Sequence, residues 1–162
     1  MLRLVLIAAA CATLLAFTDA CTADRITGNA RAYEHRQITD LAGAAPPPGT
    51  MWTDDVWDFC NGTQLARGWA AGYGGPIRLV VGVSAGRILG IRVTDHQETP
   101  GLADFLRRPE RGWLAGFSGR ARPEAMAVDA LAGATITSEA VIQAVRRAMA
   151  RADEVTIDRC RA

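Results

Sequence analysis

The chain has 162 residues, enough for one domain with a hydrophobic core, and its 49% hydrophobic content is ordinary for a folded protein. Its formal net charge is +1, and its basic residues are all arginines, spread along the chain. A nucleic-acid-binding protein needs a basic block or stripe, so the composition argues against a nucleic-acid partner.

The N-terminus begins with a basic residue, Arg3, followed by an uncharged stretch from Leu4 to Thr18 and then by Asp19. As a helix this stretch spans about 22 Å, whereas the hydrocarbon core of a bilayer is about 30 Å thick. Two interpretations stay open. The segment is a retained membrane anchor, since a helical pattern continues beyond it, or a signal peptide cleaved near Ala20. In both cases Arg3 favours export of the rest of the chain.

The sequence divides into three parts: an anchor or signal segment at 1–23, a juxtamembrane helix with a proline-rich linker at 24–50, and a domain at 51–162. We expect the juxtamembrane helix over Asp24–Leu41, because the three consecutive prolines that follow cannot continue it.

Two cysteines, Cys60 and Cys160, fall in the expected domain. Outside the cytoplasm they form either one disulfide that closes a long loop or two buried free thiols. The chain has no Cys-x-x-Cys motif and no cluster of cysteine and histidine, so we expect no zinc or iron–sulfur site.

The domain sequence predicts a hairpin-rich, mostly antiparallel sheet packed with helices, an α+β fold that follows an N-terminal anchor helix. Branched apolar runs separated by turn residues indicate a hairpin, and apolar residues at helical spacing indicate a final helix. The expected strands are 64–71, 77–83, 88–93 and a closing edge strand at 155–157, and the expected helices are a short one at 103–107 and a final one at 139–151, capped by Thr137 or Ser138. Trp113 and Phe117 are expected in the core.

Three short motifs carry the functional signal, and they occur in a fixed order. They are a glycine-rich loop at 72–77, Glu98-Thr99-Pro100-Gly101-Leu102, and Asp129 followed by Gly133-Ala134-Thr135-Ile136-Thr137-Ser138 just before the final helix. Each alone is a common turn or cap. The beginning of a helix nevertheless presents unpaired N–H groups and a partial positive charge, so a threonine there can face a phosphate or carry one.

Together these motifs resemble the FMN-binding domain family, which includes the G subunit of Rnf electron-transport complexes and the C subunit of sodium-translocating NADH:quinone reductases. The resemblance covers about residues 72–150. It implies that FMN is covalently linked through its phosphate to the oxygen of Thr135, and that a dedicated flavin transferase attaches it with FAD as donor. The chain departs from the family pattern at Ala132, where serine or threonine is usual.

The resemblance also implies the other residues of the cofactor site. The Pro-Gly turn exposes backbone groups that can recognise the polar edge of the flavin ring, and Leu102 can cover a ring face. The expected cofactor-binding residues are Thr135, Gly133, Ala134, Thr137, Ser138, Asp129, Glu98, Thr99 and Leu102. Neither a catalytic residue nor a metal is expected, because the flavin itself carries the redox chemistry.

The expected function is that of an electron carrier without independent turnover, in a membrane-bound, Rnf-like, ion-translocating electron-transport complex. The chain would be a single-pass protein of the inner membrane, with its FMN domain on the periplasmic side and the other members of the complex as partners. Two alternatives remain: a covalent-FMN carrier for another extracytoplasmic reductase, and a membrane-tethered binding or assembly module without flavin.

Overall fold

The structure is a computed structural model that describes residues 2–43, 55–59, 61–109, 111–125 and 127–155. The chain forms two compact units, Met1–Arg36 and Gln37–Ala162. The proline-rich linker, both cysteines of the expected disulfide and all of the expected edge strand except Val155 lie outside the described residues. These predictions, and the expected domain boundary at residue 51, therefore stay predictions.

The first element is one continuous helix, α1, which covers Leu2–Ala42 and so includes the helix expected over Asp24–Leu41. The apolar side chains of its first half are exposed, for example those of Leu6 and Leu15. By length and composition, α1 is the one helix among the described residues that can cross a bilayer, and a signal sequence has the same properties. The helix is therefore compatible with both interpretations of the N-terminus.

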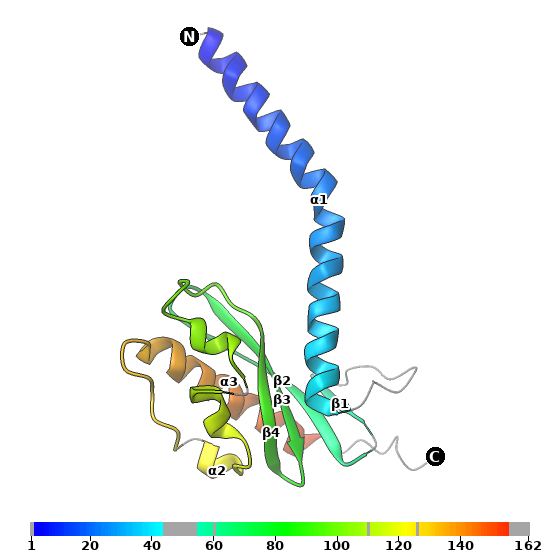
Figure 1. The fold of residues 1–162 in the computed structure, drawn as a ribbon, viewed down its shortest axis with the longest axis vertical. Coiled ribbons are helices and arrows are strands. Elements are labelled where there is room, and N and C mark those ends of the chain that lie inside the picture. The colour runs from blue at the N-terminus through cyan, green and yellow to red at the C-terminus, as the bar shows by residue number, and fades with distance from the viewer. Residues whose placement is uncertain (1, 44–54, 60, 110, 126, 156–162) are drawn as a thin grey trace. The chain divides into compact units, whose positions relative to one another are not determined.

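The second unit contains a four-stranded antiparallel sheet whose strands are neighbours in chain order: β1 (Val56–Asp58), β2 (Thr63–Ala71), β3 (Pro76–Ser84) and β4 (Arg87–Asp95) (Figure 1). β3 and β4 form the predicted hairpin. Ala85 and Gly86 make its two-residue turn, and both have positive φ, as the twist of a tight hairpin favours. The α+β class and the hairpin are confirmed.

One face of the sheet is covered by α3 (Thr135–Glu154), the final helix, which lies across it in Figure 1. Alternate residues of β3, such as Ile77, Leu79 and Val81, point into the core between sheet and helix and are fully or almost fully buried. α3 comes closest to β2 at Gly68, where any side-chain carbon would overlap the backbone carbonyl of Ala144. A glycine is therefore what allows this helix to lie so close to the strand.

The opposite face of the sheet is covered in part by the last turn of α1. Ile38, Leu41 and Ala42 are buried there with Phe59, Leu65 and Val80 in a second apolar cluster. Leu41 lies over two glycines, Gly82 and Gly90, which pair across β3 and β4. The absence of side chains at both positions leaves the space that Leu41 fills.

Three short helices connect β4 with α3: η1 (Asp104–Arg107), η2 (Trp113–Phe117) and α2 (Arg122–Ala125). η1 confirms the short helix expected near residues 103–107. Phe117 is completely buried, and Trp113 is half-buried against it with ring centroids 5.1 Å apart. Both residues therefore belong to the core, as predicted.

Two details of the sequence prediction are wrong. α3 begins at Thr135 and not at Glu139, and the residue that precedes its first turn is Ala134, which makes no side-chain cap. Thr137 and Ser138 lie inside the helix, where the hydroxyl of Thr137 donates to Glu98 and that of Ser138 donates to the carbonyls of Ala134 and Thr135. The edge strand expected at 155–157 stays untested beyond Val155, which directly follows α3 and is not itself in a strand.

Candidate functional site

The N-terminus of α3 presents Thr135 at the surface. Gly133 has a φ of 82°, a conformation that a glycine adopts without strain, and this turn brings the chain into the helix. The first bond of the helix runs from the N–H of Ser138 to the carbonyl of Ala134 at 2.9 Å. The N–H groups of the three preceding residues are therefore available to an acceptor outside the helix.

The loop before Thr135 is fastened at two points. The hydroxyl of Ser138 accepts a hydrogen bond from the N–H of Leu131 at 2.9 Å and donates back to the carbonyl of Ala134. Upstream, the indole N–H of Trp113 donates to the carbonyl of Asp129 at 2.7 Å. These bonds connect the loop to its own helix and to the core, so the position of Thr135 is fixed from both sides.

A buried carboxylate, Glu98, joins three segments of the site. One of its oxygens accepts a hydrogen bond from the N–H of Gly74 at 2.9 Å, and the other accepts one from the hydroxyl of Thr137 at 2.5 Å. Hydrogen bonds to a charged acceptor are stronger than neutral ones, and burial strengthens them further. Glu98 therefore connects the glycine-rich loop, the Pro-Gly loop and α3.

The glycine-rich loop closes tightly around this carboxylate. A side-chain carbon at Gly72 would overlap the carboxylate of Glu98, and one at Gly74 would overlap the carbonyl of Gln97. The loop folds back on itself through a 2.8 Å bond between the N–H of Gly72 and the carbonyl of Gly75. Its glycines thus serve close packing, and between them Tyr73 projects to the surface.

The three segments enclose a cavity of about 400 Å³. It is lined by Tyr73, Glu98, Thr99, Leu102, Gly133, Ala134, Thr135, Ile136 and Thr137. Three of these side chains are large, apolar and more than half exposed: Tyr73, Leu102 and Ile136. Exposed apolar groups gathered around a cavity are typical of a site that binds a partly apolar ligand.

Of the nine residues that the sequence predicted for the cofactor site, seven line this cavity together. Asp129 and Ser138 are not among its lining residues and instead hold the adjoining loop. Two further lining residues, Tyr73 and Ile136, were not predicted from the sequence. Tyr73 is the aromatic residue inside the glycine-rich motif, and Ile136 is an apolar residue next to Thr135, so both could have been found as apolar positions inside the motifs.

The cavity fits an aromatic group that carries an anion. No described residue that lines it has a positive charge, so the N-terminus of α3 is its source of positive potential. Tyr73, Leu102 and Ile136 supply apolar surface for a planar ring. Because the side-chain oxygen of Thr135 lies at the helix N-terminus, it can be esterified by a phosphate that also meets the N–H groups of the first turn.

Comparison with known proteins identifies the same region. The FMN-binding domain family matches residues 72–150. The G subunit of the ion-translocating oxidoreductase complex of Cronobacter sakazakii is 33% identical over an alignment of 171 positions, which covers 83% of this chain and 80% of that protein. The G subunit of Pseudomonas aeruginosa (strain UCBPP-PA14) is 41% identical over 90 residues, and that of Salmonella typhi is 43% identical over 89 residues.

The last two matches cover 48% of this chain and less than half of each relative, 42% and 43%. The Cronobacter relative extends the similarity over most of both proteins. The matched residues 72–150 begin at the glycine-rich loop and end within α3, so they contain all three segments that enclose the cavity. The chain therefore belongs to the FMN-binding domain family and is related to the G subunits of ion-translocating oxidoreductase complexes.

Proposed function

We propose that this protein holds FMN through a phosphoester bond to Thr135 and serves as an electron carrier in a membrane-bound, Rnf-like, ion-translocating complex. The observation that carries the proposal is the position of Thr135. It is the exposed first residue of α3, and it lines a cavity of about 400 Å³ together with Gly133, Ala134 and the loop from Glu98 to Leu102.

Attachment would change a single bond at Thr135. A separate flavin transferase would use FAD as donor, so that the bond between the threonine oxygen and the FMN phosphorus forms while the pyrophosphate bond of FAD breaks. AMP leaves, and the hydroxyl proton is lost. The N-terminus of α3 supports the product, because its free N–H groups favour the remaining negative charge on the phosphate.

The other lining residues would hold and orient the cofactor, which supplies the redox chemistry when bound. Tyr73, Leu102 and Ile136 offer apolar contacts to the ring, and Thr99 offers a hydroxyl at the cavity wall. The hydroxyl of Thr137 is committed to Glu98, so we assign this pair to keeping the cavity in shape. A covalent link, together with these contacts, would keep the flavin on the protein and therefore near its redox partners.

We place the protein in the inner membrane, anchored by α1, with the FMN domain on the periplasmic side. Two features support this placement: the exposed apolar surface of the first half of α1, and Arg3 before it, which favours a cytoplasmic N-terminus. The relatives are subunits of ion-translocating oxidoreductase complexes, so we propose that the partners of this chain are the other members of such a complex.

The attachment is tested by co-expressing the chain with a flavin transferase and recording flavin fluorescence in a denaturing gel together with the intact mass. We expect a fluorescent band whose mass is increased by one FMN minus one water. Thr135→Val keeps the shape of the side chain and removes its hydroxyl, so it should give a dark band. Thr135→Ser, which restores a hydroxyl, should regain fluorescence, and Thr94→Val on β4, outside the cavity, should keep it.

Peptide mapping identifies the attachment position. Trypsin releases residues 121–146 as one peptide, because Arg122 precedes a proline, and the hydroxyl-bearing residues of this peptide are Thr135, Thr137 and Ser138. Fragmentation should place the flavin on Thr135. A flavin found on either of the other two residues, or a bare peptide from a fully active native complex, would contradict the proposal.

A further inference from the structure

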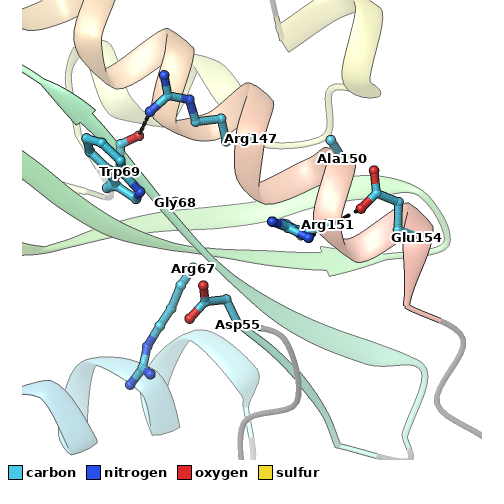
Figure 2. Close-up of a pocket in the computed structure, with 8 residues that line it drawn as sticks. All are labelled: Asp55, Arg67, Gly68, Trp69, Arg147, Ala150, Arg151 and Glu154. Carbon is cyan, nitrogen blue, oxygen red and sulfur yellow. Dashed lines mark hydrogen bonds and ion pairs between the residues drawn. The ribbon is translucent and has the colours of Figure 1, made fainter.

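A second hollow lies on the same helix, far from the flavin cavity. It has a volume of about 350 Å³ and lies between β2 and the C-terminal half of α3 (Figure 2). It is lined by Asp55, Arg67, Gly68, Trp69, Arg147, Ala150, Arg151 and Glu154. Arg147 is twelve residues beyond Thr135, or roughly 18 Å along the helix axis. The hollow is therefore separate from the cofactor site.

The centre of this hollow is an exposed tryptophan held in place by an arginine. The side chain of Trp69 is 58% exposed. The guanidinium of Arg147 lies 4.9 Å from the centroid of its ring and donates a hydrogen bond to the Trp69 carbonyl at 2.8 Å. An aromatic residue and an arginine that are preordered and solvent-accessible are the side chains most often found at the energetic centre of protein interfaces.

The neighbouring strand edge is protected against strand addition. β1 pairs with residues 64–66 of β2, so no described strand pairs with the edge of residues 67–71. On this edge the carbonyl of Trp69 accepts a hydrogen bond from Arg147, and the backbone N–H of Arg67 donates to the backbone carbonyl of Asp55 at 2.8 Å. A ligand would therefore be recognised by side chains rather than by backbone pairing.

The charges of the hollow favour an acidic partner. Of its lining charges, Arg147 and Arg151 project from α3 beside Trp69, Arg67 points away from α3 in Figure 2, and Asp55 and Glu154 supply two carboxylates. Arg151 pairs with Glu154 at 3.6 Å in an exposed contact, which contributes little to stability and can exchange for a new carboxylate. The helix dipole alone would favour a cation in the last turn of α3. It does not explain why an exposed tryptophan packs against Arg147.

We propose that this hollow docks an acidic polypeptide segment of a partner protein, with carboxylates at Arg147 and Arg151 and an apolar side chain on Trp69. Figure 2 shows the two arginines on α3 and the tryptophan on β2, with the guanidinium of Arg147 hydrogen-bonded to the Trp69 carbonyl. The carboxylates of Asp55 and Glu154 would repel a uniformly anionic lipid surface, whereas a segment of mixed sequence can avoid them.

The test uses the full chain in phosphatidylcholine nanodiscs and a fluorescein-labelled twelve-residue peptide, two repeats of Glu-Asp-Phe-Glu-Asp-Leu. Fluorescence anisotropy should show saturable binding that weakens with salt. The same peptide with glutamine and asparagine in place of its acids should not bind. The double variant Arg147→Glu with Arg151→Glu should weaken binding about tenfold or more.

The control reverses the same number of charges elsewhere. Arg108→Glu with Arg111→Glu changes two exposed arginines outside the hollow and should leave affinity unchanged within about twofold. Trp69→Ala should weaken binding without altering its salt dependence. In-gel flavin fluorescence of the same preparations should not change, so a failure of docking is distinguished from a failure of flavin attachment.

Two outcomes would overturn the proposal. One is equal weakening by both double variants, which would mean that the peptide responds to net charge alone. The other concerns nanodiscs in which one quarter of the lipid is phosphatidylglycerol. In these nanodiscs the unchanged protein would lose peptide binding, and the single variants R147E and R151E would bind the peptide again. That result would assign these arginines to the membrane surface.

Discussion

The two ends of α3 differ in almost every property that determines what a site can bind. At the N-terminus, Thr135 lines a cavity with large apolar side chains and, among the described residues, no positively charged one. Toward the C-terminus, Arg147 and Arg151 line a hollow with an exposed tryptophan. The first end offers backbone N–H groups and the hydroxyl of Thr135, and the second offers side-chain cations.

Under the two proposals above, this difference would separate permanent from reversible binding along one helix. A phosphate at the N-terminus needs no cation, because the helix dipole and the free N–H groups supply the positive potential. A polypeptide that has to dissociate again is better held by solvent-exposed arginines, because their attraction for carboxylates is moderate and is screened by salt. Both ends depend on the contact of the helix with β2, so disturbing its middle should affect them together.

The largest expected effect is at Gly68, where α3 and β2 are closest. Gly68→Ala places a methyl group against the backbone of Ala144, and because this backbone cannot move alone, we expect a loss of about 3 kcal/mol in unfolding free energy. Urea unfolding followed by circular dichroism measures it. Gly116→Ala, where a side-chain carbon meets nothing within 4 Å, is the control. Equal stability of the two variants would refute the close contact.

A smaller loss is expected from Glu98→Ala, which should affect the N-terminal end of α3 alone. The N–H of Gly74 and the hydroxyl of Thr137 lose their acceptor, at a cost of about 2 kcal/mol. Flavin incorporation should fall with the stability, while peptide binding at Trp69 should persist. Glu98→Gln keeps the shape and one acceptor oxygen, so it should recover part of the loss. Unchanged incorporation in the alanine variant would argue against Glu98 as the connection.

Thr137→Val removes one of the two bonds to Glu98 and keeps the volume of the side chain. We expect a loss of about 1 kcal/mol, because one oxygen of a buried carboxylate loses its donor. Thermal unfolding detects it, with Thr99→Val, an exposed threonine in the same cavity, as the matched control. A larger effect from the Thr99 variant would mean that the cavity is stabilised by a different contact.

The smallest effect is expected at the exposed ion pair between Arg122 and Asp153, whose atoms lie 3.1 Å apart near the C-terminal end of α3. Arg122→Gln should cost less than about 0.5 kcal/mol, since solvent screens both charges. The same substitution should not change peptide binding by Arg147 and Arg151. A stability loss comparable to that of Thr137→Val would show that this end of the helix depends on charge for folding.

The sheet could be predicted from the sequence because alternation of apolar residues is a local property. Ile77, Leu79 and Val81 indicate one buried face of a strand, and Ala85-Gly86 indicates the turn that follows. The motifs of the cofactor site could be found for the same reason, since each is short. Their order along the chain is itself typical of the family and does not depend on their positions in space.

The contacts between these motifs could not be predicted, because they join distant residues. Glu98 meets Thr137 across 39 positions and Gly74 across 24. Thr137 and Ser138 have the side chains typical of helix caps, but the helix begins four residues earlier than expected, and their hydroxyls bond instead to Glu98 and to the first turn. A local rule identifies hydroxyls suited to capping, and the tertiary fold decides how they are used.

The place of Leu41 over Gly82 and Gly90 has a consequence for any shortened form of this protein. Proteolysis before Gln37 would keep the last turn of α1 with the sheet, so that Leu65 and Val80 stay shielded from water. Cleavage just after Ala42 would remove this cover, and the released fragment should aggregate through its bare sheet face. The minimal soluble fragment therefore has to start inside a helix.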